Sequence, residues 1–181
     1  MNRLRRTGTG GSLEVEVVSI EARHVTLLRN AFHGTPWDRG PEFFEGLVGA
    51  HQAGSRHVWV GLANGCPVAF GSLVWQSTYP PFREQRIPEI HDLNVSPAFR
   101  RNGIASRIMD TAEQAAVERS NRVGIGVGLH SGYSAAQRLY VRRGYVPDGN
   151  GVFFAGRFPQ EGEQVVLDDS LTLYLIKQLT C

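Results

Sequence analysis

The segment Glu89–Ala105 (EIHDLNVSPAFRRNGIA) constrains the fold of this chain more than any other stretch. A strand pattern ends near Val95, Ser96-Pro97 makes a turn, and a helix pattern begins near Asn102-Gly103. The first N–H groups of a helix have no partner inside the helix and carry a partial positive charge. Gly103 lets an anion approach the backbone without a Cβ in the way. The order of strand, small-residue turn and helix therefore predicts a phosphate-binding turn.

The alternative is that this turn only opens an exposed surface helix, with Arg100 and Arg101 as solvated side chains. Basic residues at a helix start oppose the helix dipole, which favours Asp or Glu there. Arginine can also bind phosphate oxygens with two hydrogen bonds. The two arginines therefore favour the anion site over the plain surface helix.

The rest of the pattern is that of a mixed α/β chain without internal repeats. Apolar spacings predict strands at 13–20, 57–62, 68–76, 89–95, 122–129, 151–154 and 171–176, and helices at 21–32, 42–53, 102–119 and 133–143. Asn64-Gly65 between two strand patterns predicts a hairpin. Ser77–Pro88 contains three prolines and no period, which predicts a loop. We expect one domain over 13–181, preceded by a flexible leader at 1–12 that is not a secretory signal.

Two segments resemble motifs of the GNAT superfamily of N-acetyltransferases. Motif A is a strand followed by Gln/Arg-x-x-Gly-x-Gly/Ala at a helix start, and here it reads Arg100, Gly103 and Ala105. Ser134–Tyr145 (SAAQRLYVRRGY) resembles motif B, although Tyr133 stands where family members often carry Asn. The resemblance implies an α/β (mixed) GNAT acyl-CoA N-acyltransferase fold. In that fold a central mixed sheet, flanked by helices, is splayed between the fourth and fifth strands.

The resemblance also implies acetyl-CoA as the co-substrate. In the family, the backbone amides of the turn hold the CoA pyrophosphate. The preceding strand hydrogen-bonds the pantetheine arm as though the coenzyme were an added strand. Position by position, this assigns coenzyme binding to Leu93, Asn94, Val95, Arg100, Arg101, Asn102, Gly103, Ile104, Ala105 and Ser106.

Acyl transfer to an amine needs a base for the amine proton, a donor for the oxyanion and a proton for the departing thiolate. The motif B resemblance places Tyr140 at the CoA sulfur, where its phenol can serve as general acid. Glu89 lies eleven residues before Arg100, the offset of the base glutamate in the histone-acetyltransferase branch. His91 shares the strand face of Glu89 by period 2 and is the other candidate base. A backbone N–H of the same strand is the expected oxyanion donor.

Gly124, Gly126 and Gly128 alternate along one face of a predicted strand. They do not form the dinucleotide-binding G-x-G-x-x-G pattern, which belongs at a strand-to-helix turn. A bare strand face implies a close neighbour. That neighbour is either a tightly packed helix or the acyl group and substrate.

Loop residues often carry specificity on a rigid scaffold, and aromatic residues cluster near the predicted loop 33–41. Trp37, Phe43 and Phe44 are therefore candidates for a substrate lid, with ordinary core or surface positions as the alternative. Asp168-Asp169 is expected in a solvated turn.

Composition limits the other classes of function. A formal net charge of +2 is too small to indicate nucleic-acid binding, which would use Arg100, Arg101, Arg142 and Arg143. No apolar stretch approaches the roughly 20 residues that span a bilayer. His24, His33, His51 and His57 lack metal-ligand spacing, so no metal is expected. The separated Cys66 and Cys181 suggest no disulfide framework and a cytoplasmic location.

The sequence thus predicts an N-acetyltransferase that moves an acetyl group from acetyl-CoA to a primary amine of a small molecule or peptide by direct attack. Glu89 or His91 would be the general base and Tyr140 the general acid. A non-catalytic acyl-CoA-binding module is the alternative. Nucleic-acid and membrane partners are not expected, and the resemblance is compatible with a homodimer.

Overall fold

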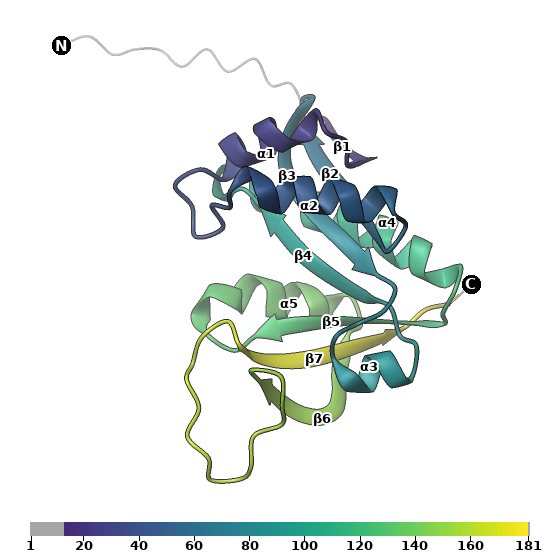
Figure 1. The fold of residues 1–181 in the computed structure, drawn as a ribbon, viewed down its shortest axis with the longest axis vertical. Helices are drawn as coiled ribbons and strands as arrows, with labels where there is room; N and C mark the ends of the chain where they lie inside the picture. The colour runs from purple at the N-terminus through teal and green to yellow at the C-terminus, as the bar shows by residue number, and fades with distance from the viewer. Residues whose placement is uncertain (1–12, 181) are drawn as a thin grey trace, which may run out of the picture.

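A seven-stranded mixed sheet forms the centre of the molecule in the computed structural model, which describes residues 13–180 (Figure 1). The leader expected at 1–12 lies outside the described residues. The strand order is β1-β2-β3-β4-β5-β7-β6, and among these strands β4–β5 is the one parallel pair. The strands are β1 (Val15–Ser19), β2 (Arg56–Ala63), β3 (Cys66–Val74), β4 (Glu89–Val95), β5 (Arg122–Gly128), β6 (Val146–Phe154) and β7 (Leu171–Gln178).

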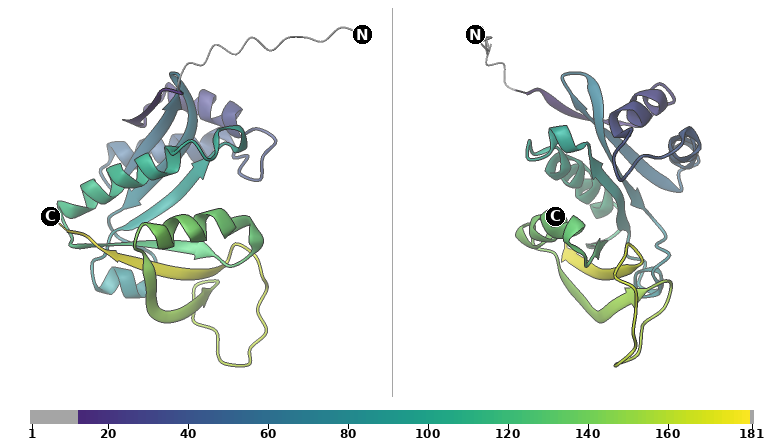
Figure 2. Two further views of the ribbon diagram at one scale, coloured as in Figure 1. Left: turned by 180° about the vertical axis from the view of Figure 1, so that it is seen from behind. Right: turned by 90° about the vertical axis from the view of Figure 1, so that its left-hand side faces the viewer.

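Helices cover both faces of the sheet (Figure 2). They are α1 (His24–Phe32), α2 (Pro41–Gln52), α3 (Pro80–Glu84), α4 (Ile104–Val117) and α5 (Ser134–Arg142), with short 3₁₀ turns η1 (Pro97–Phe99) and η2 (Ser131–Tyr133). Helices α1 and α2 lie on one face, whereas α4 and α5 lie on the other. This arrangement is the flanked mixed α/β sheet that the sequence predicts.

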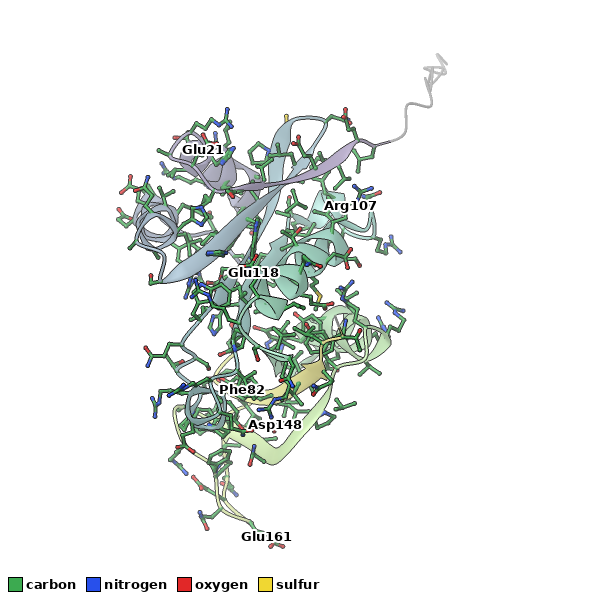
Figure 3. The ribbon with its side chains drawn as sticks, turned by 90° about the vertical axis from the view of Figure 1, so that its right-hand side faces the viewer. Glu21, Phe82, Arg107, Glu118, Asp148 and Glu161 are labelled. Carbon is green, nitrogen blue, oxygen red and sulfur yellow. The ribbon has the colours of Figure 1, made fainter. Side chains whose placement is uncertain are left out.

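The two helical layers have different cores. Under α1 and α2, Phe32 and Phe44 meet Phe70 of β3 edge-on, with ring centroids 5.1 and 5.4 Å apart. On the opposite face, the buried Ile104 and Ile108 of α4 pack against β3. Arg107 also ties α4 to the sheet edge, because its Nη1 donates to the backbone oxygen of β1 residue Val15 at 2.9 Å (Figure 3). These contacts fix the position of the α4 N-terminus.

The sheet opens between its fourth and fifth strands. Parallel pairing of β4 with β5 is limited to Glu89 with Gly124 and Ile90 with Ile125. Beyond these pairs the two strands diverge toward their C-terminal ends (Figure 1). The predicted splay is therefore confirmed, and the helices that follow both strands begin at the open end.

The hairpin predicted at Asn64-Gly65 is confirmed. Both residues have positive φ, 49° and 78°, and Ala63 pairs with Cys66 across the turn. Positive φ at both central positions is the geometry for which Asn-Gly is favoured.

The loop expected over 77–88 contains the helix α3, so this part of the prediction is wrong. Pro80 and Pro81 occupy the first helical positions, where a missing N–H costs no hydrogen bond. The helix is anchored by the buried Phe82, whose ring meets the Tyr79 ring at 4.9 Å. Figure 3 shows Phe82 near Asp148 of β6, whose carboxylate accepts a hydrogen bond from the Tyr79 hydroxyl at 2.7 Å.

Strand β6 begins at Val146, before the predicted start at residue 151. Its pairing with β7 shifts between Pro147 and Val152, so the strand carries an irregular segment. Gly149 and Gly151 there have positive φ, which breaks the alternation that the prediction required. Among the helices of residues 13–180, none has the length and apolar character needed to cross a bilayer.

Candidate active site

The turn after β4 leaves the first N–H groups of α4 open. Gly103 is the N-cap residue with a φ of 77°, and no described side chain caps the helix. No acidic residue lies in the first turn, and a Cβ at Gly103 would meet no atom within 4 Å. Free N–H groups, the helix dipole and open space together make an anion site. The turn therefore fits a phosphate group, as the sequence predicts.

The side chains of Arg100 and Asn102 hydrogen-bond to backbone carbonyls of this turn. Arg100 Nε donates to the carbonyl of Val95 at 3.2 Å, and its guanidinium lies 4.9 Å from the centre of the Trp37 ring. Asn102 does not line the cleft between β4 and β5. Its Nδ2 donates instead to the carbonyls of Phe99 at 3.1 Å and Arg100 at 3.2 Å. Asn102 thus stabilises the turn through its side chain, whereas Arg100 stays beside the anion site.

A cleft of about 880 Å³ lies between the open ends of β4 and β5. It brings the three expected catalytic residues, Glu89, His91 and Tyr140, together with the turn. Nine of the ten expected coenzyme residues line it: Leu93, Asn94, Val95, Arg100, Arg101, Gly103, Ile104, Ala105 and Ser106. One cleft thus contains an anion site and titratable groups, the combination needed for chemistry on a phosphate-bearing substrate.

Glu89 and His91 form a contact pair on the wall of this cleft. Nε2 of His91 lies 3.1 Å from Oε1 of Glu89, and the Ser77 hydroxyl donates to Oε2 at 2.5 Å. The Glu89 side chain is 2% exposed, whereas that of His91 is 39% exposed. A carboxylate only accepts hydrogen bonds, so the neutral imidazole carries its proton on Nε2 and leaves Nδ1 to accept another.

Electrostatics around His91 strengthen it as a base. The hydrogen bond to Glu89 raises the pKa of His91, against burial, which lowers it. The nearby charge of Asp92 also raises this pKa, and Arg56 lowers it. The pKa of His91 is raised overall because Glu89 and Asp92 stabilise the imidazolium more than burial and Arg56 destabilise it.

Tyr140 lies on α5 and is nearly buried, with 6% of its surface exposed. Burial raises the pKa of its phenol, so the hydroxyl stays protonated at any physiological pH. Within residues 13–180, its hydroxyl has no protein hydrogen-bond partner, and the residue lines the cleft. The phenol is therefore available as a proton donor.

The glycine face of β5 is covered by aromatic rings. A Cβ at Gly124 would collide with Phe82, and one at Gly128 would collide with Tyr133. A Cβ at Gly126 would lie 3.0 Å from the Thr172 methyl group, and Gly126 lines the cleft with Gly128. The close neighbour is therefore aromatic side chains of α3 and η2, rather than a long helix, with space for substrate farther along the strand.

Two connecting segments lie on the side where β4 and β5 diverge (Figure 1), and residues from both line the cleft. The segment between α1 and α2 contributes Trp37, and α2 contributes Phe43; Phe44 is instead fully buried in the core. The segment before β7 contributes Asp169, whose Oδ1 lies 2.9 Å from Nε2 of His130.

Sequence reasoning missed several residues of this site. Ser77, Arg56 and His130 act through partners that are 12, 36 and 39 residues away along the chain. Of these three, only His130 has a local signal, because it comes two residues after the end of β5 at the open end. Among residues 13–180, no group of three or more His, Cys, Asp or Glu side chains could hold a metal ion.

An open helix N-terminus and a carboxylate–histidine pair in one cleft fit a transferase that uses a phosphate-bearing coenzyme. The sequence matches the Acetyltransferase (GNAT) family over residues 24–145. This match covers more than half of the chain, which belongs to that family. No curated protein matches the sequence.

Solved structures share the fold. An N-acetyltransferase from Staphylococcus aureus Mu50 has 14% identity and a TM-score of 0.68, covering 92% of this chain and 99% of its own. A Salmonella typhimurium acetyl transferase that modifies the N-terminal serine of 50S ribosomal subunit protein L7/L12 has 13% identity, a TM-score of 0.67 and coverages of 92% and 95%.

A second Salmonella typhimurium protein, described as an acetyltransferase and solved with its cofactor acetyl-CoA, has 19% identity. Its TM-score is 0.65, with coverages of 92% and 94%. Family membership makes the present chain an acyl-CoA-dependent N-acetyltransferase, and the solved structures show that it shares their fold.

Proposed function

We propose that this enzyme transfers the acetyl group of acetyl-CoA to a primary amine of a small molecule or peptide, with His91 as the base that accepts the amine proton. The observation that supports this assignment is the 3.1 Å contact between His91 and Glu89 in the cleft that also contains the phosphate-binding turn. An aliphatic amine has a pKa near 10, like lysine, so only about one molecule in a thousand is neutral at pH 7. A base at the site is therefore needed.

Glu89 is better placed to orient His91 than to accept the proton itself. Both of its carboxylate oxygens are engaged, one by Ser77 and one by His91, and the side chain is buried. A buried carboxylate of this kind fixes the imidazole and stabilises its protonated form. His91, more exposed and turned into the cleft, is the group that meets the amine.

The chemical step balances with these residues. The amine nitrogen attacks the thioester carbon, which forms the C–N bond and places negative charge on the carbonyl oxygen. A backbone N–H near Leu93 or Asn94 donates to that oxygen. The carbonyl then re-forms as the C–S bond breaks with its electron pair on sulfur, which takes a proton from the Tyr140 hydroxyl, while the nitrogen loses its proton to Nδ1 of His91. Return of that proton to Tyr140 through solvent restores both residues.

Coenzyme binding uses the two features that flank this centre. The α4 N-terminus, with Arg100 and Arg101 beside it, would hold the pyrophosphate. The strand end at 93–95 would hydrogen-bond the pantetheine arm, since β4 has no β5 partner beyond Ile90 among the described residues. The exposed free thiol of Cys66 suits a reducing compartment, and we infer a cytoplasmic location.

The acceptor can be identified by measuring thiol release from acetyl-CoA. Aminoglycosides, polyamines, amino acids and peptide N-termini are compared with a no-amine reaction, and mass spectrometry locates the added acetyl group. We expect at least one amine class to accelerate release and to gain its acetyl group on nitrogen. Acceleration by no class, in an enzyme that binds acetyl-CoA, would contradict the proposed amine acceptor.

A further inference from the structure

Asp92 interrupts β4 two residues after the pairing of this strand with β5 ends. Its φ is 52°, in the left-handed region that non-glycine residues seldom occupy. Phe70 of β3 pairs with Asn94 and Ser72 pairs with His91, so two β4 residues lie opposite the single Gly71. This is a β-bulge, which bends a strand and increases its local twist.

An ion pair holds the bulged residue. Nη1 of Arg56 lies 2.6 Å from Oδ2 of Asp92, and the two side chains are only 24% and 26% exposed. Arg56 begins β2, which is separated from β4 by β3, so the pair crosses a whole strand. Partial burial reduces screening by water and salt, so this pair is stronger than a freely exposed one.

The bulge lies between the part of β4 that pairs with β5 and the strand end that does not. Pairing with β5 ends at Ile90, two residues before Asp92. All of β4 lines the cleft, and the strand end proposed to meet the pantetheine arm, residues 93–95, begins one residue after Asp92. The direction of this strand end therefore depends on the conformation of Asp92.

We propose that Arg56 is a positioning residue, which holds the Asp92 bulge so that the strand end 93–95 meets the pantetheine arm of acetyl-CoA. The inference rests on the proposed coenzyme site. Arg56 lies outside the lining of the cleft and acts through Asp92. Its loss lets the left-handed residue relax, which misdirects the strand end before any substrate chemistry begins.

The test compares Arg56→Gln with Arg122→Gln. Arg122 is a matched control because it also begins a strand, is partly buried and makes one side-chain hydrogen bond, to Gln85 at 3.0 Å. Calorimetry measures the Kd of acetyl-CoA, and thermal melting measures Tm. Arg56→Gln should weaken binding by about three- to tenfold, which lies within the range usual for such coupling, while Arg122→Gln stays within about twofold of wild type.

Affinity for acetyl-CoA is the informative measurement because binding requires no proton transfer to His91. A change in the charge near His91 alone would alter the pH–rate profile and leave this Kd unchanged. Equal affinities of the two variants would overturn the inference, whatever their Tm values. A wild-type enzyme that does not bind acetyl-CoA would instead overturn the proposed function.

A second pair of variants tests whether Arg56 acts through Asp92. Asp92→Gly removes the ion pair but allows positive φ without strain, whereas Asp92→Ala removes the pair and keeps the strain. We expect Asp92→Gly to bind acetyl-CoA more tightly than Asp92→Ala. Adding Arg56→Gln to Asp92→Gly should change Kd no further, because contacting residues are not additive. A full additional loss would show that Arg56 acts elsewhere and would overturn the inference.

Discussion

Nε2 of His91 lies 3.1 Å from Oε1 of Glu89, and the second carboxylate oxygen accepts a hydrogen bond from Ser77. In this pair the Glu89 carboxylate is buried, whereas the His91 imidazole reaches the cleft. Because the carboxylate raises the pKa of His91, the imidazole becomes a stronger base and also stays protonated to a higher pH. The contact between Glu89 and His91 therefore sets both the orientation of the imidazole and the pH dependence of the site.

Replacing Gly103 by Glu should abolish measurable acetyl-CoA binding. The new carboxylate lies at the phosphate-binding helix start, where it would repel the pyrophosphate and fill its space. Gly54→Glu is a matched control, because Gly54 has a φ of 71°, an equally open Cβ position and an exposed location outside the cleft. Calorimetry should show normal affinity for Gly54→Glu; unchanged affinity in a folded Gly103→Glu variant would place the coenzyme elsewhere.

Removing the Tyr140 hydroxyl should affect turnover more than coenzyme binding. Tyr140→Phe keeps the buried ring and deletes the proton donor, so kcat should fall by about 10²–10⁴-fold at similar acetyl-CoA affinity. Tyr145→Phe removes a buried hydroxyl of the same core, one that donates to Glu113 at 3.0 Å and does not line the cleft. The control should lower Tm and keep kcat. Full activity of Tyr140→Phe would assign this tyrosine to the core alone.

The glycine face of β5 gives a stability prediction. Gly124→Ala should lower the free energy of unfolding by about 1–3 kcal/mol, because the methyl group collides with the buried Phe82 ring. Gly46→Ala, in the middle of α2 with open space around it, should raise stability by about 0.5–1 kcal/mol. Urea denaturation measures both changes. A neutral Gly124→Ala would mean that α3 moves away without cost.

The parts of the fold that could be predicted from the sequence are those with local causes. The hairpin at Asn64-Gly65 and the turn at Gly103 follow from backbone preferences of a few neighbouring residues. The α3 helix was missed because Pro80 and Pro81 were read as loop formers, although proline is equally suited to a helix start.

The site was predicted less completely, because several of its contacts join distant residues. The face shared by Glu89 and His91 follows from strand periodicity, and the structure shows in addition that the two side chains are in contact. The same periodicity fails at Asp92, where the bulge depends on Arg56, 36 residues away. No pattern along the chain records that Ser77 donates to Glu89, since their proximity arises only when the sheet forms.

The pH dependence of kcat/KM in wild type and Glu89→Gln tests the central claim most directly, because this profile reports the free enzyme's essential base. His91 must be neutral to accept a proton, and Glu89 raises its pKa. The acid limb of the wild-type profile should therefore lie above about pH 6.5, the ordinary histidine value. Glu89→Gln removes the stabilising charge, so the limb should move to lower pH, with a reduced plateau. His91→Ala should lose this limb and keep only the rise toward about pH 10 that comes from deprotonation of the amine itself. A limb that stays in place in Glu89→Gln, or that persists in His91→Ala, would contradict the assignment of this pair as the base.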